Sequence, residues 1–206
     1  MTKLNDTENN MIKTRWLALG GLLITTLLLN ACVPVVVVGG ATTTASVAHD
    51  RRTTGSVVED QSIKIRIHSA LDEDEELKKQ AHINIASFNG IVLLSGETPT
   101  SAMRQRAGDI ARRTEKVRRV HNEITIAAPS SFMTRSSDSW ITTKLKTSLL
   151  TVKHKGFDPT RIKVVTENGT VFLLGMVTHS EADAATEKVR ESSGVQRIVK
   201  LFEYLD

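Results

Sequence analysis

The hydrophobic positions between Ile63 and the end of the chain follow one pattern twice. Apolar residues recur at every fourth position, two short apolar runs then flank an Asn-Gly pair, and a second helical stretch and a last apolar run follow. The run "IKIRIHSAL" from Ile63 matches "ITTKLKTSL" from Ile141, and "INIASFNGIVLLSG" from Ile83 matches "IKVVTENGTVFLLG" from Ile162. The copies are offset by 78 or 79 residues throughout, so the chain carries an internal duplication.

Each copy predicts the same order of elements. The four-residue spacing predicts a first helix, and Asn89-Gly90 and Asn168-Gly169 predict hairpins, because a type I′ turn requires positive φ at both central residues. The other elements are second helices at residues 101–113 and from about Ser180, and last strands at residues 120–126 and 196–202. We therefore expect an α+β fold in which each αββαβ unit packs two helices on one face of a small mixed sheet.

The first residues have the pattern of a bacterial signal peptide. Lys3, Lys13 and Arg15 precede "WLALGGLLITTLLLNA", an uncharged run that is shorter than the about 20 residues of a membrane span. The run ends in "LLNAC", which resembles the lipobox of bacterial lipoproteins. That resemblance implies cleavage before Cys32, acylation of this only cysteine and, because Val33 follows it, sorting to the outer membrane. The alternative is an uncleaved signal anchor with a buried free thiol.

The pattern divides the chain into five expected segments. They are a signal peptide (1–31), a lipidated flexible tether (32–58), a first domain (59–127), a polar linker (128–137) and a second domain (138–206). Several acyl chains on Cys32 would anchor the protein stably, since each buried methylene contributes about 0.8 kcal/mol.

Several motifs of the duplicated unit resemble those of BON domains. They are the Asn-Gly hairpin, the glycines that end its second strand (Gly96 and Gly175), the "GV" at Gly194, and the stretches "AHIN", "DSWITTKLKTSLL" and "VVTENGTVFLLG". Two such units behind a lipobox resemble the dual-BON lipoproteins of Gram-negative outer membranes, and this resemblance covers the chain from Cys32 onward. Copy one departs from the pattern at Lys116, where the family unit has glycine, which puts only the local turn geometry in doubt.

The family resemblance implies a protein of the periplasmic face of the outer membrane that supports envelope integrity at the division site. It implies that the first helix of the second BON domain binds an anionic phospholipid such as phosphatidylglycerol. It also implies contact with proteins of outer-membrane protein assembly or with regulators of peptidoglycan amidases.

The first helix of copy two places large apolar residues on two sides. At about 100° per residue, Ile141, Leu145 and Leu149 form one stripe, which is the side expected to face the core. Trp140 and Leu150 lie off this stripe. The helix therefore carries two apolar surfaces, of which the fold needs only one.

Copy one acts as an internal control for this second surface. It has Ser62 in place of Trp140 and Asp72 in place of Leu150, so the fold does not require large apolar residues there. A tryptophan beside lysines favours the interface of an anionic membrane. The candidate phospholipid-binding residues are Trp140, Thr143, Lys144, Lys146, Thr147, Leu150, Thr151 and Lys153. The alternative is that Trp140 packs under the linker or against copy one.

The sequence shows no catalytic or metal-binding constellation. The six histidines, at positions 49, 68, 82, 121, 154 and 179, lack the close pairing of metal ligands, and neither a nucleophile elbow nor a phosphate-binding glycine loop is present. The acidic run at residues 72–76 lacks the ligand spacing of an EF-hand and is expected to be a solvated loop or a weakly repulsive element that keeps copy one away from anionic lipid. We expect no enzyme activity, no cofactor and no metal site.

Composition and charge exclude little beyond nucleic acid. The net charge is +4, and the basic run at residues 112–119 is expected to be a solvated helix end or a site for an acidic partner. Aromatic residues make up only 4% of the chain, so the stacking platforms of a nucleic-acid binder are absent. The second functional hypothesis is a protein-binding adaptor or chaperone-like module, with Trp140 as an interface hot spot.

Overall fold

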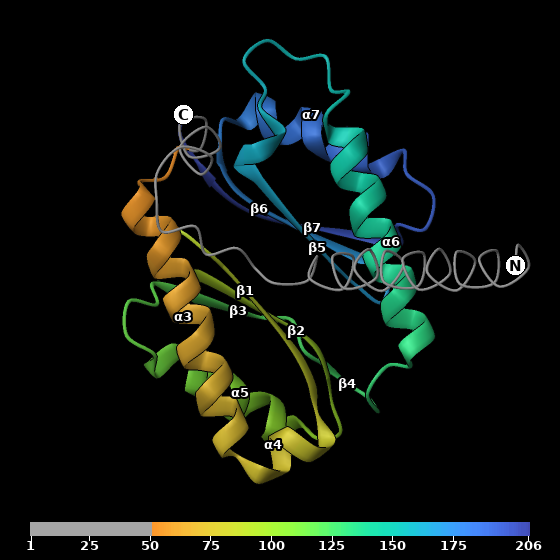
Figure 1. Cartoon of the computed structure of the whole chain (residues 1–206). Helices are drawn as coiled ribbons and strands as arrows, with labels where there is room; N and C mark the ends of the chain where they lie inside the picture. Colours follow the sequence, from red (N-terminus) through yellow and green to blue (C-terminus); the bar gives the residue numbers. More distant parts are fainter. Residues whose placement is uncertain (1–50) are drawn as a thin grey trace, which may run out of the picture. The chain divides into compact units, whose positions relative to one another are not determined.

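The computed structural model describes residues 51–206 (Figure 1). The first copy contains α3 (Thr54–Glu73), α4 (Glu75–Gln80), β1 (His82–Phe88), β2 (Ile91–Thr98), α5 (Ser101–Arg113), β3 (Arg119–Asn122) and β4 (Thr125–Ile126). The second contains α6 (Phe132–Leu149), the 3-10 helix η2 (Pro159–Arg161), β5 (Ile162–Glu167), β6 (Thr170–Val177), α7 (His179–Arg190) and β7 (Arg197–Tyr204). Within these residues no helix has the length and apolar character of a membrane span. The expected α+β fold with two αββαβ units is confirmed.

Each copy forms a mixed sheet around its second strand. Strand β2 pairs antiparallel with β1 and parallel with β3 and β4, and β6 pairs antiparallel with β5 and parallel with β7. Two helices cover one face of each sheet, α3 with α5 and α6 with α7 (Figure 1). Their core residues include Ile63, Ile67, Met103 and Ala107 in copy one and Leu145, Leu149, Ala182 and Ala185 in copy two.

The second face of each sheet contributes to a third apolar cluster. Successive side chains of a strand point to opposite faces, so each central strand supplies residues to two cores. The buried members of the third cluster are Ala86, Phe88 and Leu93 from copy one and Phe172, Leu174 and Leu201 from copy two. Both copies therefore share one buried core in addition to their own.

Both hairpins close with the expected turns and a buried aspartate. Asn89 and Asn168 have φ of 52° and 46°, and the glycine after each is also positive, as a type I′ turn requires. Asp60 of α3 accepts hydrogen bonds from the backbone N–H groups of Asn89 and Gly90 at 2.7 and 2.9 Å. Asp138 of α6 makes the same pair of bonds to the second turn at 2.8 and 3.0 Å. In both copies, therefore, an aspartate of the first helix is hydrogen-bonded to the turn of the hairpin.

The helices begin earlier than the sequence predicted. Helix α6 starts at Phe132, within the expected linker 128–137, and α3 starts at Thr54, within the expected tether 32–58. Each start has an N-cap that the apolar spacing does not reveal, since the hydroxyls of Ser131 and Thr53 accept from N–H groups three residues later. The connection between the two domains is therefore shorter than expected.

The acidic run at residues 72–76 is not the solvated loop that we expected. Its first residues end α3, and Asp74 caps α4 by accepting hydrogen bonds from two backbone N–H groups of that helix. Arg106 of α5 pairs with Asp74 at 3.2 Å and also with Glu76. Leu77 is buried in the core of copy one. A cap, an ion pair and one core residue together order this segment.

The last strands differ between the copies. Strand β7 runs without a break, whereas copy one has β3 and β4, with Ile124 buried between them. The turn before β3 has Lys116 at φ 67°, the left-handed region in which Gly194 of copy two lies at φ 94°. Copy one therefore keeps the turn of the glycine-containing unit with a lysine in it.

Candidate functional site

Helix α6 separates its apolar residues as the sequence predicted. Ile141, Leu145 and Leu149 are buried in the core of copy two, whereas Trp140 is 70% exposed and Leu150 is 69% exposed. The alternative in which Trp140 packs under the linker or against copy one is wrong, because a side chain so exposed has no such covering. The helix leaves its largest side chain in solvent.

The polar residues of the predicted site form the rest of this surface. Thr143 and Thr147 donate their hydroxyls to backbone carbonyls four residues earlier, at 3.0 and 3.1 Å, and Thr151 donates to a carbonyl of the same helix at 2.7 Å. These hydroxyls are therefore already satisfied within the helix. Lys146 and Lys153 are exposed. Lys144 is half-buried and donates to the hydroxyl of Ser193.

Two further residues of α6 belong to this face and were missed. Phe132 and Met133 are 78% and 77% exposed. Phe132 lies about five helical turns before Leu150, and Met133 about two turns before Trp140, so the four side chains share one side. Sequence reasoning missed them because the segment was taken as linker; Ser131 before an apolar pair is the signal that indicates a helix start. We call Phe132, Met133, Trp140 and Leu150 the exposed stripe.

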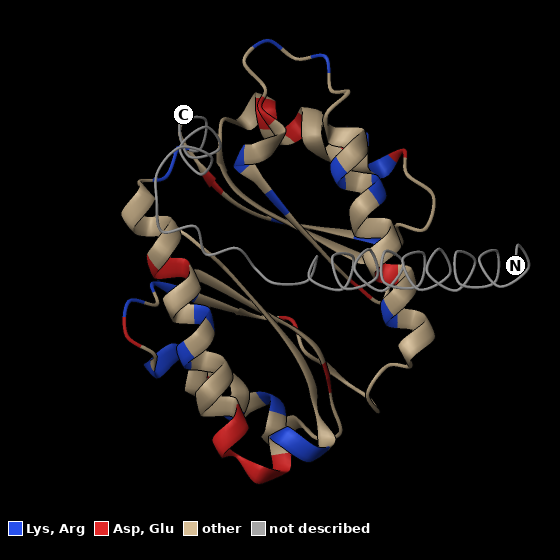
Figure 2. Cartoon of the chain, in the orientation of Figure 1, with Lys and Arg blue, Asp and Glu red and all other residues tan. Residues whose placement is uncertain are grey.

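The matching face of α3 differs in charge as well as in size. Val58 and Ile65 are exposed there, so copy one is not free of apolar residues on this side. Its Arg66, however, pairs with Glu59 at 2.5 Å. Figure 2 shows acidic residues gathered where α3 ends and α4 begins, whereas the second half of α6 carries basic residues. Helix α6 thus combines larger exposed side chains, Trp140 and Leu150, with Lys144 and Lys146 and lacks the acidic residues that follow α3.

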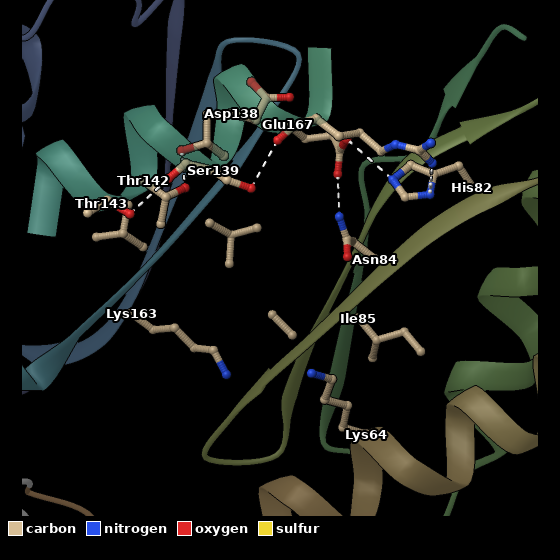
Figure 3. Close-up of a pocket in the computed structure, with 15 residues that line it drawn as sticks. Lys64, His82, Asn84, Ile85, Asp138, Ser139, Thr142, Thr143, Lys163 and Glu167 are labelled. Atoms are coloured by element: carbon tan, nitrogen blue, oxygen red, sulfur yellow. Dashed lines mark hydrogen bonds and ion pairs between the residues drawn. The ribbon is translucent and has the colours of Figure 1, made fainter. Parts of the chain in front are cut away.

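A cleft of about 590 Å³ is lined by residues of both copies. In Figure 3, Lys64, His82 and Asn84 come from copy one, and Asp138, Lys163 and Glu167 from copy two. Lys163 donates to the backbone carbonyl of Ser87 at 3.0 Å. Burial lowers the pKa of the Lys163 ammonium, and nearby Lys64 adds to this effect while Asp60 opposes it.

At one end of this cleft a histidine and two glutamates converge. His82, Glu97 and Glu167 each offer a ligand atom, and these atoms all lie within 4.8 Å of one another. Burial raises the pKa of Glu167, and the charge of Glu97 adds to the effect, while the hydrogen bond from Asn84 opposes it. The spacing of the histidines in the sequence did not reveal this group, because its members are distant in the sequence and meet only in the fold.

The basic run at residues 112–119 is largely paired within the fold. Arg112 pairs with Asp109 at 2.6 Å, and Arg118 pairs with Glu203 at 3.0 Å. Arg113 and Arg119 are exposed. The predicted lipidation site, Cys32, lies outside the described residues, as do the expected signal peptide and most of the expected tether.

Comparisons with known proteins agree with the duplicated architecture. The family model described as "BON domain" matches residues 59–128 and 137–206. "Outer membrane lipoprotein DolP" of Haemophilus influenzae is 40% identical over 185 residues, which cover 90% of this chain and 94% of that protein. "21 kDa hemolysin" of Actinobacillus pleuropneumoniae is 38% identical over 156 residues, which cover 76% of this chain and 79% of that protein.

Among solved structures, the chain is similar to the C-terminal domain of CdsD, a structural protein of the type III secretion system of Chlamydia trachomatis. The identity is 17%, and the match covers 71% of this chain and 67% of that chain with a TM-score of 0.28. A likeness of this size carries no argument about arrangement or function.

Proposed function

Because the chain belongs to the BON-domain family and is a lipid-anchored protein on the periplasmic face of the outer membrane, we propose that the outer face of α6 binds anionic phospholipid. The predicted family and location are confirmed by the two family matches and by the similarity to an outer-membrane lipoprotein. In this proposal, acylated Cys32 is the anchor and the second BON domain makes a second membrane contact. The protein acts by binding and not by catalysis.

The observation that carries the proposal is the exposed stripe on a helix whose other side is fully packed. Each of its four side chains gains about 1.5–3 kcal/mol on full burial, and partial insertion at the headgroup level recovers part of this. Tryptophan is one of the two side chains enriched at such an interface. The helix has 18 residues, or about 27 Å, and can lie flat on a bilayer surface.

Charge adds selectivity for anionic lipid. Lys146 and Lys153 are exposed near Leu150, and a basic residue close to an anionic surface contributes about 1 kcal/mol. The half-buried Lys144 can contribute after leaving Ser193. In this proposal the lysines favour phosphatidylglycerol over a neutral lipid, while the exposed stripe supplies the part of the affinity that does not depend on headgroup charge.

The anchor makes a weak second contact sufficient. A chain of the length between Cys32 and Arg51 spans at most about 70 Å, so the domain remains close to the membrane at all times. Binding through α6 is then effectively intramolecular, and even a low intrinsic affinity gives high occupancy. Through this contact the protein would support envelope integrity at the division site, as the family resemblance implies.

A vesicle-binding comparison tests the proposal. The processed chain with Cys32→Ser lacks the anchor, so its sedimentation with vesicles reports the α6 face alone. We expect co-sedimentation with phosphatidylglycerol-containing vesicles and not with phosphatidylcholine vesicles. Trp140→Glu should abolish it, and the matched change Ser62→Glu in copy one should not. Equal binding by both variants would place the membrane contact elsewhere.

The exposed stripe also favours a second candidate, a protein-binding adaptor. An aromatic residue among other apolar side chains is typical of an interface hot spot. Its partners would be proteins of outer-membrane protein assembly or amidase regulators. A folded Cys32→Ser protein that binds to vesicles of no composition would favour this candidate.

A further inference from the structure

The cluster of His82, Glu97 and Glu167 is built from both BON domains. His82 and Glu97 are direct partners in the antiparallel pairing of β1 and β2, so the strand register places them side by side. Glu167 ends β5 of the other domain. One imidazole and two carboxylates thus meet at the end of the cleft shown in Figure 3, where His82 and Glu167 face one another.

The two carboxylates are deeply buried and close together. Glu97 is 1% exposed and Glu167 is 6% exposed. Among residues 51–206 neither forms an ion pair with lysine or arginine; the one cationic candidate is His82, whose Nε2 lies 3.9 Å from Glu167 Oε1. Two buried like charges are costly without a cation between them. Within the described residues, no lysine or arginine neutralises these two carboxylates, so a bound cation would stabilise the cluster.

At His82 and Glu167, the atoms that face one another have no hydrogen-bond partner within the described residues. Nε2 of His82 is buried and has no hydrogen-bond partner in the described part of the chain. At Glu167, both hydrogen bonds go to Oε2, from the Asn84 amide at 2.9 Å and the Ser95 hydroxyl at 3.3 Å. Oε1 of Glu167 is therefore left to face His82 Nε2 alone.

The remaining hydrogen bonds orient these groups as outer contacts orient metal ligands. Glu97 accepts from the amide of Asn168 and, at 3.1 Å, from the backbone N–H of Ser130. Each carboxylate oxygen has a second lone pair that such bonds leave available. A metal ion at about 2.1 Å from each ligand holds ligand atoms about 3.5 Å apart, so ligand atoms that now lie within 4.8 Å of one another need to approach by at most about 1.3 Å to complete the site.

The contact between Arg135 and His82 is expected to weaken metal binding. Its guanidinium lies 3.4 Å from Nδ1 of His82. Because a guanidinium only donates, a hydrogen bond here requires the tautomer in which Nδ1 accepts and Nε2 carries the ring proton. A metal on Nε2 moves that proton to Nδ1, and the exposed Arg135 side chain must then turn away. Removal of Arg135 should therefore strengthen metal binding.

From this geometry we propose that His82, Glu97 and Glu167 bind one divalent cation of the zinc class between the two BON domains. One nitrogen and two oxygens are a ligand set that zinc accepts, with water from the cleft as a further ligand. Since the ligands come from both domains, the bound ion stabilises the docked pair by linkage. The ion has a structural role, and no catalysis is proposed for it.

Calorimetric titration of the processed Cys32→Ser chain with zinc chloride tests this site. We expect one ion per chain, and binding at least about tenfold weaker after His82→Ala or Glu167→Gln. The matched control is His68→Ala, which removes an exposed histidine beside Asp72 and should leave the affinity unchanged. Arg135→Ala should bind more tightly than the parent.

Thermal unfolding distinguishes a bridging ion from surface binding. Zinc at a large excess over its dissociation constant should raise the midpoint by roughly 5 °C, and magnesium should not. As a control for folding, His82→Ala and Glu167→Gln should unfold cooperatively, without zinc, near the midpoint of the parent. Unchanged titrations in His82→Ala and Glu167→Gln, or no binding by the parent, would overturn the proposal.

Discussion

The guanidinium of Arg51 holds the carboxylate of Glu181 by two hydrogen bonds, of 2.7 and 2.9 Å. Arg52, the next residue, pairs with Asp60 at 2.6 Å and lies over the ring of Phe88. Adjacent arginines before α3 thus contact opposite copies of the repeat. The chain that leads from the membrane anchor is attached to both domains where it enters the fold.

This ion pair predicts a loss of stability in acid. Burial alone raises the pKa of Glu181, but hydrogen bonds from Arg51 and Thr178 outweigh it and hold the pKa below its usual value. A lowered carboxyl pKa contributes stability above the unfolded value of about 4.3 and loses it as the pH falls through the folded value. Glu181→Gln keeps the capping geometry and should cost on the order of 1–2 kcal/mol at pH 7.

Unfolding by denaturant at several pH values from 7 to 3 measures this effect. The stability difference between parent and Glu181→Gln should shrink as the pH falls below about 4.3. A difference that stays constant over the whole range would mean that the charge of Glu181 makes no contribution.

The burial of Lys163 predicts that the free energy of unfolding depends on pH in the alkaline range. Burial lowers its pKa in the folded protein, whereas the unfolded lysine titrates at about 10.4. Between the two values the unfolded chain binds more protons, so the stability of the parent rises with pH through this window. Lys163→Met should lack that rise. Unfolding curves of both proteins between pH 7 and 10.5 provide the comparison, and parallel profiles would contradict it.

The turn at Lys116 predicts a stabilising substitution. A left-handed backbone costs a residue with a side chain about 1 kcal/mol or more relative to glycine. Lys116 is exposed, so its replacement removes no buried contact. Lys116→Gly should therefore raise the free energy of unfolding by about 0.5–1 kcal/mol. Lys155→Gly, at an exposed loop position next to Gly156, serves as the control and should not stabilise.

The repeat, its hairpins and the buried stripe of α6 could be predicted because they depend on local spacing. Ile141, Leu145 and Leu149 recur every fourth residue, and Asn168-Gly169 has few conformations other than its turn. The early start of α6 was missed because one hydroxyl, that of Ser131, decides it. The cluster around His82 could not be predicted, since Glu97 and Glu167 reach it only through strand register and docking of the two domains.

The copies also show what duplication leaves free to change. Asp60 and Asp138 are the same residue type in both copies because each accepts hydrogen bonds from the backbone N–H groups of its turn. Trp140 and Ser62 have diverged because neither contributes to a core. Function is therefore best sought among paired positions whose side chains are exposed and unlike.

The central claim is that the exposed stripe of α6 enters an anionic bilayer. The fluorescence of Trp140, which belongs to this stripe, reports such insertion directly. Trp140 is the only tryptophan from Cys32 onward, so the signal of the processed Cys32→Ser chain is specific to it. Phosphatidylglycerol-containing vesicles should shift its emission to shorter wavelength, and high salt should reverse the shift, because the lysine contribution is screened. An emission maximum that stays at the solvent-exposed value with every vesicle composition would contradict the account.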